Sequence, residues 1–164
     1  MNKTQNTRYI VTGAIIAAAY VVLTFISNIF GLAFGPIQLR ISEALCILPL
    51  FTPAAIPGLT IGCFISNILS FNALDMLFGT FATLTAALLT RVFKNKLLFG
   101  MPLLSLLPPV LINALVVGLE ITLFIEQTAG FFITALQVGI GQFIVCYLLG
   151  IPLYFAIKNK RNIF

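Results

Sequence analysis

The chain has 164 residues, of which 60% are hydrophobic and only 8% are charged, and its formal net charge is +5. Soluble domains carry about 25% charged residues because their surfaces face water, so this composition excludes an ordinary soluble fold and predicts a membrane protein. Histidine is absent, which argues against His-based acid–base catalysis and most catalytic zinc sites. We expect one domain over residues 1–164, without metal or cofactor.

Hydropathy predicts six helices, since a spanning helix needs about 20 apolar residues. The first is Ala-rich, and a signal peptide ending near Ala19 is a competing interpretation, although the apolar run continues beyond it. The second is short and carries Pro49, and a proline turn at residues 53–58 follows it. The predicted segments cover residues 9–30, 40–51, the end of that turn to about 70, 74–90, 103–125 and 131–157. The sequence therefore predicts an all-α membrane protein, a compact bundle of six transmembrane helices.

The basic residues lie beside the ends of the apolar segments. Positive charge accumulates on the cytoplasmic side of membrane proteins, so we expect both termini to be cytoplasmic. The cytoplasmic residues are then Lys3, Arg8, Arg91, Lys94, Lys96, Lys158, Lys160 and Arg161. This pattern explains the positive charge without a nucleic-acid partner. The four acids fall in the outer half or the outer loops: Glu43, Asp75, Glu120 and Glu126.

Several polar side chains occur at membrane depth, where ionisable groups are costly and usually face a cavity or a partner. We interpret them as a substrate site open to the outside. An alternative for the amides is interhelical hydrogen bonding worth about 0.6 kcal/mol each. Glu120 has no cationic neighbour in sequence, so a ligand or water must satisfy it, whereas Glu126 is expected in a solvated loop. The predicted substrate-binding residues are Glu43, Glu120, Asn67, Asn113, Gln137, Arg40, Asp75 and Gln142.

Arg40 and Glu43 are charged residues three positions apart at the start of the second segment. One interpretation is a local ion pair that neutralises both charges, with Ser42 as a helix cap. The other is a ligand role for Glu43, and the two are compatible if Arg40 holds the carboxylate in place.

Small residues form stripes on two predicted helices. Ala14 and Ala18 make a small-xxx-small pair in the first helix, which permits close approach of another helix. That helix could belong to a partner or to this chain. The true GxxxG of Gly58 and Gly62 directly follows a turn, which favours internal packing. The three cysteines have no CxxC spacing and are expected to be small buried hydrophobes.

Residues 38–45 (QLRISEAL), 48–59 (LPLFTPAAIPGL) and 61–63 (IGC) resemble the QueT family. Members are substrate-binding components of energy-coupling factor (ECF) transporters associated with queuosine precursors. The resemblance implies an ECF coupling module, made of a transmembrane coupling protein and two cytosolic ATPases, docked at Ala14 and Ala18. The sequence has no GxxxxGK[ST] motif, so ATP hydrolysis would come from such partners.

The chemistry that the resemblance implies fits the polar residues. A 7-deazaguanine base offers N–H donors to carboxylates and a carbonyl to amides, and a precursor with an aminomethyl group is a cation. A stacking face could come from Phe30, Phe34, Phe71 or Phe131. Alternatives are a binding component for another nutrient or vitamin, and a self-sufficient secondary transporter. No inverted repeat of the kind such carriers use is evident, and no nucleophile–base motif supports an enzyme.

Overall fold

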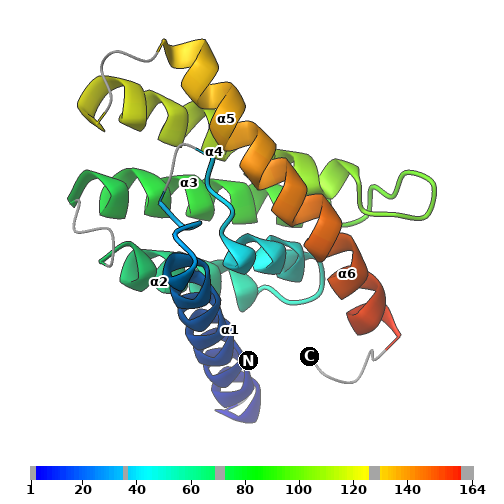
Figure 1. The fold of residues 1–164 in the computed structure, drawn as a ribbon. Helices are drawn as coiled ribbons and strands as arrows, with labels where there is room; N and C mark the ends of the chain where they lie inside the picture. Colours follow the sequence, from blue (N-terminus) through cyan, green and yellow to red (C-terminus); the bar gives the residue numbers. More distant parts are fainter. Residues whose placement is uncertain (1–2, 35–36, 69–72, 126–129, 160–164) are drawn as a thin grey trace.

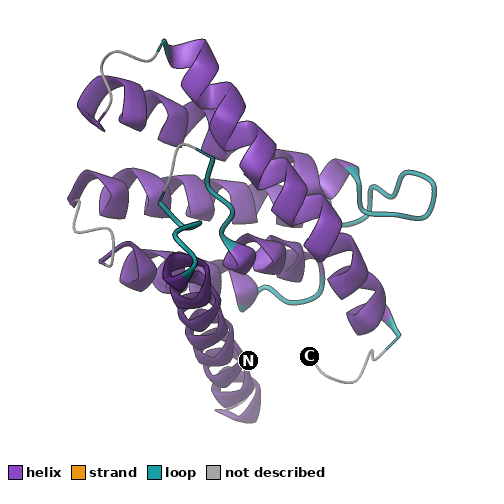
Figure 2. Cartoon of the chain, in the orientation of Figure 1, coloured by secondary structure: helices purple, strands orange, loops and turns teal. Residues whose placement is uncertain are grey.

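The computed structural model describes residues 3–34, 37–68, 73–125 and 130–159, and helices dominate this part of the chain (Figures 1 and 2). The first four helical elements are α1 (Lys3–Ile29), η1 (Ile41–Leu50), α2 (Ala55–Asn67) and α3 (Ala73–Val92). A fifth helical run joins a 3₁₀ turn, an α-helix and a π-helical end: η3 (Leu104–Leu106), α4 (Leu107–Glu120) and η4 (Ile121–Ile125). The sixth joins α5 (Phe131–Phe143), the π-helix η5 (Ile144–Leu149) and α6 (Gly150–Lys158).

The predicted all-α membrane bundle is confirmed. Four runs in the described part of the chain are long and apolar enough to cross a bilayer, namely Lys3–Ile29, Ala73–Val92, Leu104–Phe124 and Phe131–Lys158. The two shorter helices are η1 with 10 residues and α2 with 13. At 1.5 Å per residue α2 covers about 20 Å, less than the hydrocarbon core of about 30 Å.

Helices α1 and α2 run side by side in the same direction, in close contact. A Cβ atom on Gly58 would lie 2.7 Å from the carbonyl oxygen of Gly13, and one on Gly62 would lie 2.9 Å from that of Ala17. Larger side chains are therefore excluded at both glycines. The prediction that this GxxxG serves internal packing is confirmed.

A hydrogen-bond ladder holds η1 antiparallel to α1. We call it the α1–η1 ladder, and its rungs are Ile41 N–H to Ser27 Oγ (2.9 Å), Thr24 Oγ1 to Ser42 Oγ (2.7 Å), and the Tyr20 hydroxyl to the Glu43 carboxylate. The predicted cap by Ser42 is wrong, because Ser42 accepts from Thr24 and the helix begins without a side-chain cap. Polar side chains on one face of α1 thus bond to the start of η1 in place of a side-chain cap.

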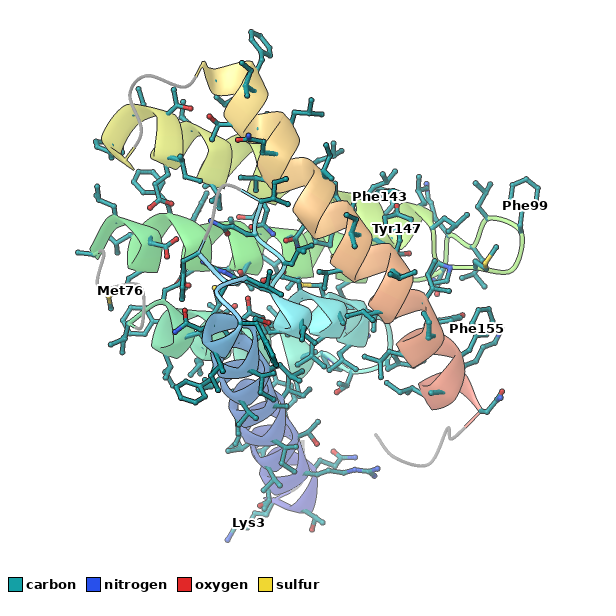
Figure 3. All side chains as sticks on the ribbon, in the orientation of Figure 1. Lys3, Met76, Phe99, Phe143, Tyr147 and Phe155 are labelled. Carbon is teal, nitrogen blue, oxygen red and sulfur yellow. The ribbon has the colours of Figure 1, made fainter. Side chains whose placement is uncertain are left out.

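The basic end of α3 contacts the end of η1. Pro49 lies inside η1, and Arg91 at the end of α3 donates from Nη1 to the Pro49 carbonyl at 2.8 Å. Beyond it, a connection projects from the bundle and turns at Phe99 and Gly100 (Figure 3). Both turn residues have positive φ (53° and 74°), as in the type I′ turn of a hairpin.

The bundle exposes apolar side chains, and inside it a set of buried polar side chains lies beside an apolar core. Large hydrophobic side chains such as Leu115, Phe132 and Leu136 are exposed, as expected for contact with lipid. The three cysteines are free and buried, as predicted. Most predicted site residues are also buried: Arg40, Glu43, Asn67, Asp75, Asn113, Glu120 and Gln142. Buried polar groups need partners, and those partners define the site.

Candidate functional site

A small cavity lies among the chain leading into η1, η1 itself, and helices α3, α4 and α5. Its volume is about 10 Å³, and it is lined by Gln38, Arg40, Glu43, Gly79, Thr83, Asn113, Val117, Val138 and Gln142. A cavity of this size holds at most about one water molecule, whereas ligand pockets enclose about 300–1,000 Å³. The cavity is therefore too small for a small-molecule ligand, and the polar groups around it bond mainly to one another.

Glu43 is at the centre of these bonds. One carboxylate oxygen accepts from the Tyr20 hydroxyl of α1, and Oε2 accepts from Gln142 Nε2 of α5 at 2.7 Å and from the Cys46 thiol at 3.1 Å. The side chain is 4% exposed. Three donors from three helices thus hold this carboxylate in place.

Arg40 bonds away from Glu43. Its Nε donates to the Ala33 carbonyl at 2.8 Å and its Nη1 to Asn67 Oδ1 at 2.9 Å, while Nη2 lies 3.5 Å from Asp75 Oδ2. The guanidinium also stacks over Phe34, 4.6 Å from the ring centroid. The interpretation of Arg40 and Glu43 as a local ion pair is therefore wrong, because Arg40 reaches across to the start of α3 and is paired there with Asp75.

Asn67 and Asp75 form the layer behind Arg40. Besides accepting from Arg40, Asn67 donates from Nδ2 to the Asp75 carbonyl at 2.9 Å. Gly79 makes this possible, since a Cβ atom there would lie 2.6 Å from Asn67 Nδ2. These two predicted residues thus support the cavity wall through Arg40.

Helix α4 carries two of the predicted residues on one face. Asn113 lines the cavity together with Val117, and Glu120 follows three residues later, which keeps it on the same helical face. Glu120 is 1% exposed, and neither of its carboxylate oxygens has a hydrogen-bond partner in the described part of the chain. It lies beyond the cavity, at the end of the bundle where α3 begins.

Gln137 is not among the residues that line the cavity. It is half-buried on α5, and its neighbour Val138 takes the position in the cavity wall. Gly141, one turn further, allows the backbone of Gln38 to lie directly against α5. The chain leading into η1 therefore depends on this glycine for its position beside Gln142.

Sequence reasoning missed several residues of the site. Tyr20 binds Glu43, while Gln38, Gly79 and Thr83 line the cavity. One signal was available on α1, because Tyr20, Thr24 and Ser27 recur at the spacing of one helical face. Gln38 and Thr83 carried no comparable pattern.

The predicted stacking aromatics do not form a wall of the cavity. Arg40 occupies a face of Phe34, Phe131 packs against Phe132 at 5.6 Å, and Phe30 is exposed. Phe71 lies outside the described residues, as does the predicted loop residue Glu126. The apolar walls are instead Val117 and Val138. The stacked ring pair Phe143 and Tyr147, with centroids 4.4 Å apart, lies further along the same helical run (Figure 3).

A second, apolar groove of about 690 Å³ lies between α1 and α2. Four small residues of α1 line it; Ala14 and Ala18 are exposed, whereas Gly13 and Ala17 are buried against α2 at its floor. The two interpretations of this stripe, packing against this chain and docking of a partner, thus apply to different residues. Gly13 and Ala17 contact this chain's own α2, and Ala14 and Ala18 remain accessible.

Two comparisons with known proteins found transporters that are similar to this chain. The model of a family described as QueT transporter matches residues 10–159. The queuosine precursor transporter QueT of Lactococcus lactis subsp. cremoris (strain MG1363) is 45% identical over 82 residues, which are 50% of this chain and 48% of that protein. The match therefore spans about half the length of this relative. No solved structure matches significantly.

Proposed function

The chain belongs to the QueT transporter family, and from this premise we propose that it captures a queuosine precursor from outside as the substrate-binding subunit of an ATP-driven ECF importer. The protein is a multi-pass protein of the bacterial plasma membrane, with four helical runs long enough to span it. The name of its Lactococcus relative supports the substrate.

The observation that carries the proposal is the convergence of hydrogen-bonding side chains from four helices (η1, α3, α4 and α5) and the chain leading into η1 on one small cavity. Glu43 offers acceptor oxygens, while Asn113 and Gln142 offer both donors and acceptors, and Val117 and Val138 flank them. A flat base with donors beside a carbonyl can satisfy such a set. To bind, it would expand the cavity and displace the Gln142 amide from Glu43.

The accessible groove supports docking of a coupling protein. Its lining is apolar and includes the small residues Ala14 and Ala18, which allow another helix to approach closely. We propose that the transmembrane coupling protein of an ECF module occupies this groove, and that its two ATPases supply the energy. This assignment extends the resemblance noted in the sequence.

The decisive experiment is ligand binding by the purified protein without partners. We expect a 7-deazaguanine base to bind with nanomolar affinity, equivalent to about −12 kcal/mol, and mass analysis of the purified protein to detect a co-purified base. Asn113→Ala should weaken binding, whereas Leu115→Ala, on the exposed face of the same helix, is the matched control. Failure to bind 7-deazaguanines, together with binding of a vitamin, would identify a component for another nutrient. Uptake by this chain alone in vesicles would identify a secondary transporter.

A further inference from the structure

The three buried acids of the described chain differ in their partners. Glu43 accepts from Tyr20, Cys46 and Gln142, and Asp75 is paired with Arg40. Glu120 is as deeply buried, yet neither oxygen receives a hydrogen bond from the described residues. Burying a carboxylate without a partner is strongly unfavourable. An exception of this kind inside a membrane bundle indicates a functional group.

Glu120 continues the polar surface that lines the cavity. On α4, Asn113, Val117 and Glu120 share one face, and the first two are cavity residues. Helix α3 packs against α4, and on it Gly79 and Thr83 are cavity residues as well. Three residues of α-helix rise about 4.5 Å, so Glu120 lies about that distance along α4 from the cavity residue Val117. A substituent on a cavity-bound base can span that distance.

The charges around Glu120 determine what it can bind. The charged groups whose fields reach it are Asp75 and Arg40, and these two form an ion pair with each other. Their charges largely cancel, and Glu120 remains the uncompensated acid. A neutral hydrogen-bond donor would leave an ionised carboxylate here without a counter-charge, whereas an ammonium group would supply that counter-charge and donate up to three hydrogen bonds.

We propose that Glu120 receives a cationic amine carried by the ligand, and so makes the site selective for amine-bearing 7-deazaguanines over uncharged ones. This inference rests on the proposed function and names the substrate class within it. Glu43, whose oxygens have three donors within the protein, binds the N–H groups of the ring. Glu120 binds the charged substituent. The two carboxylates therefore have separate roles in recognition.

The test compares two ligands that share a ring and differ in charge: 7-aminomethyl-7-deazaguanine and 7-cyano-7-deazaguanine. We expect the purified wild-type protein to prefer the amine about ten- to a hundredfold, the range of one charge-assisted hydrogen bond. Glu120→Gln should remove this preference while retaining affinity for the nitrile. Glu120→Asp, which keeps the charge on a shorter side chain, should retain part of it.

Thermal unfolding without ligand separates this role from a structural one. If Glu120 awaits an amine, Glu120→Gln should leave the melting temperature unchanged or raise it, because an unpaired buried acid is removed. A marked fall would show that the carboxylate holds the fold and would overturn the proposal. Equal affinity of the wild-type protein for both ligands, or an undiminished preference in Glu120→Gln, would also overturn it. Binding of neither ligand would instead contradict the proposed function, and this inference with it.

Discussion

The Arg40 guanidinium is paired with Asp75, 35 positions away, and not with Glu43, three positions away; its Nη2 lies 3.5 Å from Asp75 Oδ2. Local charge pairing in a helix requires side chains that project from a regular α-helical surface. Arg40 instead precedes a 3₁₀ helix in extended backbone. From there it reaches α2 and α3, and Glu43 is bound by donors on α1, η1 and α5.

Removing Arg40 should therefore destabilise the protein through Asp75. Because Arg40→Met leaves a buried carboxylate without its cation, we expect a loss of about 3–5 kcal/mol in the free energy of unfolding. Adding Asp75→Asn should restore much of the loss, whereas adding Glu43→Gln should not. Thermal unfolding of the single and double variants in detergent measures the coupling of Arg40 to Asp75 and to Glu43. Rescue by Glu43→Gln instead would contradict the observed pairing.

Tyr20→Phe should destabilise the protein by removing a hydrogen bond to the Glu43 carboxylate. The substitution removes one donor from a buried carboxylate and retains the ring, so we expect about 1–3 kcal/mol of destabilisation. Tyr9→Phe, on the same helix in the apolar groove, is the matched control and should be nearly neutral. Thermal unfolding of both variants provides the measurement, and equal stability of the two would show that the Tyr20 bond contributes nothing.

Gly141→Ala should disturb the cavity wall. Its new methyl group would overlap the Gln38 backbone, and overpacking of this kind costs about 1–3 kcal/mol. Gly150→Ala lies in the same helical run, and its Cβ would meet nothing closer than 3.6 Å. Since alanine is the better helix former, this control should be neutral or stabilising. Melting temperatures and ligand affinities would be measured for both variants. A loss of stability in both would show that this helical run requires glycine in general and would contradict a specific role for Gly141.

Bulky residues in the groove should block docking selectively. Ala14→Trp and Ala18→Trp are expected to prevent assembly with an ECF coupling module while nearly preserving ligand affinity, because both side chains are exposed and remote from the cavity. Ile15→Trp, exposed on α1 but not among the groove residues, is the control. Co-purification with the module and ligand binding would be measured together. Preserved assembly with lost binding would argue against docking at this groove.

Membrane orientation follows from the basic residues. Reporter fusions at Asn95, in the connection after Arg91, should be cytoplasmic, and fusions at Gly130, before α5, should be external. The expected result also places both termini in the cytoplasm. The reverse pattern would contradict the orientation, although the helical fold would stand.

The fold was more predictable than the site. Segment lengths and prolines located the helices well, because hydrophobic length is a local property of the chain; even η1, with Pro49 inside it, was found. The predicted residues Arg40, Glu43, Asn113 and Gln142 do line one cavity. Their partners were not predictable, because Asp75 for Arg40 and Tyr20 for Glu43 depend on how distant helices pack. Gln137 illustrates the same limit, since one residue along α5 decides whether a side chain faces the cavity.

The α1–η1 ladder has a mechanical consequence. Its three bonds join consecutive residues of η1 to one face of α1, so a slip of one residue between the two helices would break every rung at once. At intermediate positions of η1 along α1, none of these three hydrogen bonds would form. The helix that lines the apolar groove and the segment that carries Glu43 are therefore coupled, because a displacement of one along the other would cost all three hydrogen bonds.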